Sequence, residues 1–113
     1  IAVHGPSTLV SLADGAITET IIAPGQFGIA TAPLDRLRGG SPDENAAMLR
    51  ALFAGQTDTP TLQSYRDIVI LTAAAALLVA GRAPSIAAAM PIARDMLDSG
   101  AAAERLARFI AFR

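Results

Sequence analysis

The longest apolar run of the chain covers residues 68–80, and Thr72 is the only polar side chain within it. A run of this length falls short of the roughly 20 residues that a membrane span requires. Ser64 and Asp67 have the spacing of a helix-capping box before the run, and Gly81 after it is typical of a helix C-terminus. Because the run has no polar stripe, the pattern predicts a helix buried on every side inside a globular protein.

Three further helices are predicted from apolar positions that recur at helical spacing. The first takes Ser41 as its cap and ends at Gly55. The second begins at Ser85, has Ile86, Met90, Ala93 and Leu97 on one face, and contains Pro91, which should kink or delay it. The third follows a break at Gly100. We expect the last helix to bury one side, formed by Ala102, Leu106, Phe109 and Ile110.

The start of the chain has the composition of β structure. Residues 1–3, "IAV", predict a short buried strand. The stretches "STLVSL" and "AITETII" flank Asp14-Gly15, a dipeptide that favours a tight hairpin turn between two strands. The proline and glycine residues of 24–33 then indicate a loop.

The predicted order is therefore strands in residues 1–23, a loop in 24–40 and helices in 41–113. Strands followed by a run of three to four helices indicate part of an α/β or α+β domain, and the length allows one domain. Only 4% of the residues are aromatic while 52% are apolar, so the core must be built from Ala, Leu, Ile and Val. Such a core buries little area per residue, and we expect the chain to be unstable by itself.

Charge and cysteine content exclude several classes of protein. The formal net charge of −1 gives no electrostatic reason to expect binding to nucleic acid or to an acidic membrane surface. The chain has no cysteine, which excludes disulfides and thiolate metal sites. The opening "IAVHGPST" lacks the basic and apolar regions of a signal peptide, so the expected location is the cytoplasm.

Few residues could support chemistry, and each has a structural alternative. His4, the only histidine, follows the first predicted strand, but a hydrogen-bonded structural histidine is the preferred interpretation. Asp43 and Glu44 could hold Mg²⁺, yet both fall in a first helical turn, where acids stabilise the helix N-terminus. The "RGG" of residues 38–40 could approach a phosphate, but the chain has no lysine, so a glycine turn is favoured. These residues alone name no reaction.

Several longer segments, taken in order, do suggest a family. "PGQFGI", "LDRLRGGSPDENAAMLRALFAG", "YRDIVILTAAAALLVAGRA" and "ARDMLDSGAAAERL" resemble the C-terminal third of the anthranilate phosphoribosyltransferases. The predicted hairpin also resembles that family's corresponding strands. The resemblance implies the C-terminal part of a phosphoribosyltransferase α/β catalytic domain. It also implies a transferase that moves phosphoribosyl from phosphoribosyl pyrophosphate to anthranilate in tryptophan biosynthesis, with Mg²⁺, as a homodimer formed through an N-terminal helical domain.

The departures from the family's pattern concern its functional residues. The glycine-rich phosphate loop and the anthranilate-contacting residues of the family lie in an N-terminal part that is absent from this sequence. His4 and Gly5 match residues that lead into a loop whose Asp-Glu pair holds Mg²⁺, but here Gly5 runs directly into Pro6. We therefore expect a missing loop between residues 5 and 6. His4 and Gly5 are the candidate substrate-binding residues, and no catalytic residue or metal ligand can be assigned.

Two other functions fit the sequence and stay open at this point. A piece of this family that lacks the active-site loops could be a non-catalytic structural or binding subunit. A pyrimidine nucleoside phosphorylase shares the general fold but should not share the "RGG…ENA" region so closely. An Asp-Glu pair encoded between Gly5 and Pro6, together with an upstream glycine-rich loop, would favour the transferase.

Overall fold

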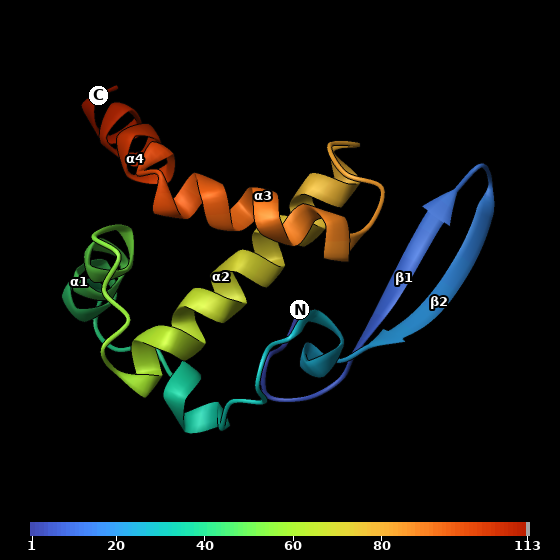
Figure 1. The fold of residues 1–113 in the computed structure, drawn as a ribbon, viewed down its shortest axis with the longest axis horizontal. Helices are drawn as coiled ribbons and strands as arrows, with labels where there is room; N and C mark the ends of the chain where they lie inside the picture. The colour runs from blue at the N-terminus through green and yellow to red at the C-terminus, as the bar shows by residue number, and fades with distance from the viewer. Residues whose placement is uncertain (113) are drawn as a thin grey trace.

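The computed structural model describes residues 1–112 and shows a hairpin followed by four helices (Figure 1). Two 3₁₀ turns join the two parts. The elements are β1 (Ser7–Ala13), β2 (Ala16–Ile22), η1 (Pro24–Phe27), η2 (Leu34–Leu37), α1 (Pro42–Phe53), α2 (Pro60–Val79), α3 (Ile86–Asp98) and α4 (Ala101–Ala111). The predicted order of strands, loop and helices is confirmed.

The hairpin turn forms where the Asp-Gly dipeptide predicted it. Asp14 has a φ of 51° and Gly15 a φ of 78°, and a type I′ turn requires positive φ at both central residues. The strands pair antiparallel from Ala13 opposite Ala16 to Ser7 opposite Ile22. This turn alone sets the register, because a two-residue loop leaves one way to pair the strands.

The first three residues do not form the predicted strand. Val3 is fully buried, as expected, but its carbonyl accepts a single backbone hydrogen bond from the N–H of Ala32 at 2.9 Å. A strand needs a ladder of such bonds, and no neighbouring strand lies beside these residues within the described chain. The prediction of burial is right and that of a strand is wrong.

Helix α1 begins with the predicted capping box. The Oγ of Ser41 accepts a hydrogen bond from the N–H of Glu44 at 3.3 Å, and the carboxylate of Glu44 accepts one from the N–H of Ser41 at 2.7 Å. Pro42 occupies the first helical position, where its missing N–H is not needed. Two of the helix's unpaired N-terminal donors are thereby satisfied.

Helix α2 begins earlier than predicted, and the expected cap at Ser64 is wrong. Thr59 is the cap, since its Oγ1 accepts a hydrogen bond from the N–H of Leu62 at 3.2 Å, and Pro60 follows at the first helical position. Ser64 is buried inside the helix and its hydroxyl donates to the carbonyl of Pro60 at 2.9 Å. A threonine cap followed by proline fixes the start one turn upstream, so Asp67 has no capping role.

Helix α3 keeps its predicted start and face. The Oγ of Ser85 accepts a hydrogen bond from the N–H of Ala88 at 3.1 Å, and the helix continues through Pro91 without a delayed start. The predicted stripe is confirmed, and the residues of α3 that are buried are Ile86, Ala89, Met90, Ala93 and Leu97.

The core lies where α3 crosses α2 (Figure 1). Leu71 and Ala74 of α2 are buried there against α3, where Ala89 is fully buried. Paired alanines let the two helix backbones approach closely. Leu52 of α1, Ile29 of the loop after η1, and Val3, Ile22 and Ala32 also belong to this small core. It follows that one face of α2 is held firmly inside the molecule.

The other face of α2 is not buried, contrary to the prediction of burial on every side. Thr72, Ala76 and Val79 are exposed, and Val79 is 89% accessible. The radius of gyration, 15.1 Å, exceeds the about 13 Å expected for a compact domain of this length. The hairpin and the other helices spread apart instead of closing around α2. The described elements therefore leave this face of the helix uncovered.

The predicted buried side of α4 is also wrong for the described residues. Phe109 is 78% exposed and Ile110 is 52% exposed, and no residue of α4 between Ala101 and Ala111 is buried. The helix extends away from the body of the molecule and meets α3 only near its start (Figure 1). An amphipathic pattern predicts which side would be buried but not whether a partner is present.

Candidate functional site

The two candidate substrate-binding residues lie in a tight bend before β1. The N–H of Ala2 donates to the Oγ of Ser7 at 3.0 Å, which closes the bend around His4 and Gly5. The His4 side chain is exposed and makes no hydrogen bond to other parts of the described chain, so it is not the hydrogen-bonded structural histidine that we preferred. A Cβ on Gly5 would meet no atom within 4 Å. His4 is therefore open to solvent or to a further segment, and half-buried Gly5 has free space beside its Cα.

The acidic pair at the start of α1 acts as a cap. Hydrogen bonding from the N–H and hydroxyl of Ser41 lowers the pKa of the Glu44 carboxyl below its ordinary value. This carboxylate is thus already engaged, and Asp43 beside it lies in the same first turn. No group of three metal-ligating side chains occurs among residues 1–112. The residues present do not fit a magnesium site.

The backbone groups of the glycine turn before α1 are likewise engaged in local hydrogen bonds. The amide oxygen of Asn45 accepts from the N–H of Gly40 at 2.9 Å, and its amide nitrogen donates to the carbonyl of Gly40 at 3.0 Å. A Cβ on Gly40 would collide with the Glu44 side chain, whose own Cβ would lie 3.1 Å away. Since the N–H groups of Gly40 and Ser41 are both used, no phosphate loop forms here. The glycine-turn interpretation is confirmed.

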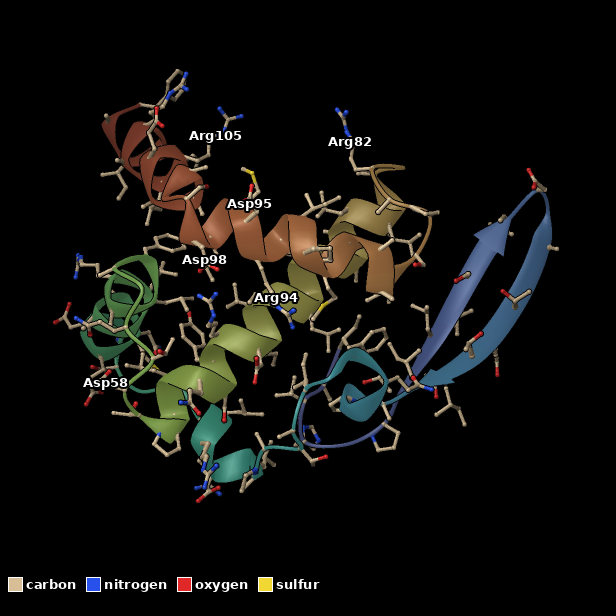
Figure 2. All side chains as sticks on the ribbon, viewed as in Figure 1. Asp58, Arg82, Arg94, Asp95, Asp98 and Arg105 are labelled. Carbon is tan, nitrogen blue, oxygen red and sulfur yellow. The ribbon has the colours of Figure 1, made fainter. Side chains whose placement is uncertain are left out.

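An ion pair ties α2 to α3 beside the core. The Nη2 of Arg66 lies 2.6 Å from the Oδ1 of Asp98, and the Arg66 side chain is 18% exposed. Burial raises the pKa of the neighbouring Asp67 carboxyl, while Arg94 and then Arg66 act to lower it. Figure 2 shows Asp98 on the inner side of α3, whereas Arg105 extends outward. These groups hold two helices together and form no acid–base pair in a cleft.

The hollows of the described surface are mainly apolar. A cavity of about 280 Å³ lies between η2, α1 and α2, with Arg36 and Arg38 at its edge and Tyr65 in its wall. A larger one of about 470 Å³ lies along α2 and has only apolar side chains, Phe53 and Met96 among them. Neither lining brings together a nucleophile, a general base and an oxyanion donor, the set that acyl transfer requires.

Similarity to known proteins identifies the family to which the chain belongs. Residues 1–103 match the model of the glycosyl transferase family, a/b domain. The chain belongs to this family. Over 111 residues it is 42% identical to an anthranilate phosphoribosyltransferase of Sorangium cellulosum and 45% identical to one of Methylobacterium nodulans. The match covers 98% of this chain but 31% and 32% of the two relatives.

A solved structure gives the same result. The crystal structure of anthranilate phosphoribosyltransferase from Thermus thermophilus superposes with a TM-score of 0.80 at 35% identity. The superposed region covers 96% of this chain and 31% of the Thermus thermophilus chain. The resemblance drawn from the sequence is confirmed, as is the partial α/β fold. The described elements thus correspond to about a third of the length of these relatives.

Some structural residues had not been singled out from the sequence. Asn45 bridges both backbone groups of Gly40, and its position just after the capping box was the available signal. The pairing of Arg66 with Asp98 joins residues far apart in the chain, and no local pattern predicts it. Nothing in the described chain approaches His4 and Gly5 from another element to test their role, which stays a prediction.

Proposed function

We propose that this chain is the C-terminal part of an anthranilate phosphoribosyltransferase. The enzyme would transfer phosphoribosyl from phosphoribosyl pyrophosphate to anthranilate and release pyrophosphate, a step of tryptophan biosynthesis. The observation that carries the proposal is the match of nearly the whole chain to enzymes of that name, at 40–45% identity across the relatives compared. The shared fold of the Thermus thermophilus enzyme supports it.

In this proposal the chain supplies structure and not chemistry. Departure of pyrophosphate from C1 of ribose needs positive charge and hydrogen-bond donors placed where negative charge grows. The N–H groups at the start of α1, which could have served, are already bonded to Asn45 and Glu44. The reacting groups must then come from polypeptide outside these 113 residues, in the two thirds of the relatives' length that this chain does not span.

We also propose that the enzyme uses Mg²⁺, and that the metal ligands, like the reacting groups, lie outside the described residues. A divalent cation would neutralise charge on the leaving pyrophosphate. The described residues do not fit it, since they offer no cluster of carboxylates. We propose that its ligands lie in a loop between Gly5 and Pro6 that this sequence lacks. His4 and Gly5 would lead into that loop and contact substrate there. His4 is exposed and a Cβ on Gly5 would meet no atom within 4 Å, which leaves room for both roles.

The remaining parts of the proposal concern assembly and location. We place the enzyme in the cytoplasm, as a homodimer formed through the N-terminal region. Helix α2 is long and apolar enough to pass for a membrane span, with 22% of its most apolar window buried. We propose that α2 is instead an interior helix of the complete α/β domain, because such helices are also long and apolar. The ion pair of Arg66 with Asp98 would be costly in lipid.

The test compares two proteins for anthranilate-dependent release of pyrophosphate. The product of the complete reading frame should turn over both substrates, and residues 1–113 alone should not. Turnover by residues 1–113 would contradict the assignment of chemistry to other segments. An inactive full-length protein would point to the non-catalytic alternative. Phosphorolysis of uridine or thymidine, measured in parallel, would point instead to a pyrimidine nucleoside phosphorylase.

A further inference from the structure

The cavity of about 280 Å³ between η2, α1 and α2 combines apolar walls with two cations. The side chains that form its apolar part are Leu37, Met48, Tyr65 and Ile68. Arg36 and Arg38 add two positive charges to the lining, and no carboxylate belongs to it. This is a local departure from the chain as a whole, whose formal net charge is −1. The cavity therefore has the polarity of a site for an anion with an apolar body.

Three packed elements hold the walls of this cavity in place. Both η2 and α1 lie against α2, and Tyr65 and Ile68 in the first half of α2 form part of the wall (Figure 1). Leu37, Tyr65 and Ile68 are half-buried and pack on the hydrophobic core. Asn45, also in the lining, is fixed by its two hydrogen bonds to Gly40. The cavity is thus formed before a ligand enters, which lowers the entropic cost of binding.

Both arginines are unpaired within the described residues. Arg36 and Arg38 are exposed, and the ion pair of residues 1–112 is made by other side chains, Arg66 and Asp98. Asp35 adjoins Arg36 in the sequence but lies outside the lining and forms no ion pair within the same residues. A guanidinium presents paired N–H donors in a plane, and these match the two oxygens of a carboxylate. The edge of the cavity can therefore hold a carboxylate.

The backbone beside the cavity disfavours a phosphate group. Phosphate sites at a helix start use several backbone N–H groups. Here the N–H of Gly40 donates to Asn45 and that of Ser41 donates to Glu44. The volume of about 280 Å³ is just below the range of about 300–1,000 Å³ that is common for ligand pockets. A small ligand with a single ring fits such a space.

We propose that this cavity binds a small organic carboxylate with one apolar ring. The carboxylate would contact Arg36 and Arg38 at the edge, and the ring would lie against Met48 and Tyr65 inside. This binding site goes beyond the proposed function and does not depend on the reaction. Anthranilate belongs to the same chemical class as the ligand, so a test must report on this cavity and not on an active site elsewhere.

Methyl NMR of the full-length protein observes the cavity itself. Met48 lines it, whereas Met90 is buried in the core and Met96 lines the larger apolar cavity. The methionine methyl groups are labelled with ¹³C, and their signals are assigned with Met48→Leu, Met90→Leu and Met96→Leu. Titration with 3-phenylpropionate should shift the Met48 signal to saturation and leave the signals of Met90 and Met96 in place. A Met48 signal that does not move, or equal shifts of all three, would overturn the proposal.

The role of charge is tested with a neutral ligand of the same shape. In the same titration, 3-phenylpropanamide should bind on the order of ten-fold more weakly than 3-phenylpropionate, because hydrogen bonds to ionised groups are the stronger ones. Equal affinities would overturn the proposal, since the cavity would then select only the apolar ring. Tighter binding of phenyl phosphate than of 3-phenylpropionate would overturn the choice of a carboxylate.

Matched arginine variants assign the contact. Arg36→Gln and Arg38→Gln should each weaken binding of 3-phenylpropionate by about three-fold to ten-fold. Arg50→Gln is the control, because Arg50 is exposed on α1 and lies outside the lining. Weakening by the control as large as by the other two would contradict the proposal. Since the titration needs no turnover, an inactive enzyme that binds the carboxylate here would contradict only the proposed function.

Discussion

The crossing of α2 and α3 and the hairpin are both built from the predicted elements, but only the crossing has a core. Ala74 and Ala89 are fully buried at the crossing and Leu71 is 1% exposed. In the hairpin Ile22 is the one buried residue. The hairpin's shape comes from its turn, whereas the crossing depends on contact between distant segments. Local signals thus predict that an element forms, and neighbours decide whether it is buried.

The strand register of the hairpin places its exposed apolar side chains on one face, which has no covering layer in the described chain. Thr8 pairs with Ile21, Val10 with Glu19 and Leu12 with Ile17, so these six side chains share one face. The exposed large apolar residues of that face are Val10, Leu12, Ile17 and Ile21. A two-stranded hairpin is at best marginally stable in water without further strands or a covering layer. The hairpin and the exposed face of α2 therefore both lack a covering layer among the described residues.

The largest expected effect concerns the crossing. Replacing Leu71 by alanine in the full-length protein should lower the free energy of unfolding by about 2–5 kcal/mol, because a cavity replaces a fully buried side chain. Urea denaturation measures this value. A loss below about 1 kcal/mol would show that the crossing is not the core of the described region.

The next effect compares two alanines on opposite faces of α2. Ala74→Leu should cost about 1–3 kcal/mol through overpacking at the crossing. Ala76→Leu should cost a similar amount in the full-length protein if further polypeptide covers this exposed face of α2. Ala47→Leu, on the exposed face of α1, is the control and should change little. If Ala76→Leu behaves like Ala47→Leu in urea denaturation, this face of α2 faces solvent in the full-length protein.

A smaller effect is expected at the start of α1. Ser41→Ala removes the side-chain acceptor of the capping box and should cost about 1 kcal/mol, within a range of about 0.5–2. Ser11→Ala in the exposed hairpin is a suitable comparison, because its side chain has no hydrogen bond in the described chain. Thermal unfolding of both variants should show the larger drop for Ser41→Ala. Equal drops would mean that the cap contributes nothing.

The smallest effects are pH dependences of opposite sign. The lowered pKa of Glu44 means that its carboxylate stabilises the fold at neutral pH, and this contribution is lost as the pH falls through the lowered pKa. The raised pKa of Asp67 means the reverse: the ionised form weakens the fold, and stability is regained as the pH falls from the raised value to the ordinary one.

Two variants separate these contributions in urea titrations between about pH 7 and pH 3. Glu44→Gln should lose less stability on acidification than the unmodified protein. Asp67→Asn should be the more stable protein at neutral pH, with a gain that disappears in acid. Parallel profiles for all three proteins would contradict both assignments.

Several details of the fold could be predicted because the signals are local. Asp14-Gly15 defines the hairpin, and Ser41 and Ser85 define the starts of α1 and α3. The start of α2 was misplaced because Ser64 with Asp67 has the spacing of a capping box. Thr59-Pro60 upstream provides both a cap and a proline at the first helical position. Where two start signals compete, the spacing alone does not decide between them.

Burial and site could not be predicted in the same way. The sequence predicts which side of α4 is apolar, but nothing in the described chain lies beside Phe109 to bury it. His4 was expected to be hydrogen-bonded and is exposed. The proposed function rests on the resemblance of several long segments taken together. The groups that perform phosphoribosyl transfer are, in our proposal, on polypeptide that this sequence does not contain.

The central claim, that these residues fold only as part of a larger domain, is tested most directly by amide hydrogen exchange and urea unfolding of residues 1–113 alone. The account predicts rapid exchange along α2, including Ile70 and Leu71, and unfolding without a cooperative transition. A monomer in dilute buffer that unfolds cooperatively, with long-lived protection of these amides, would contradict it.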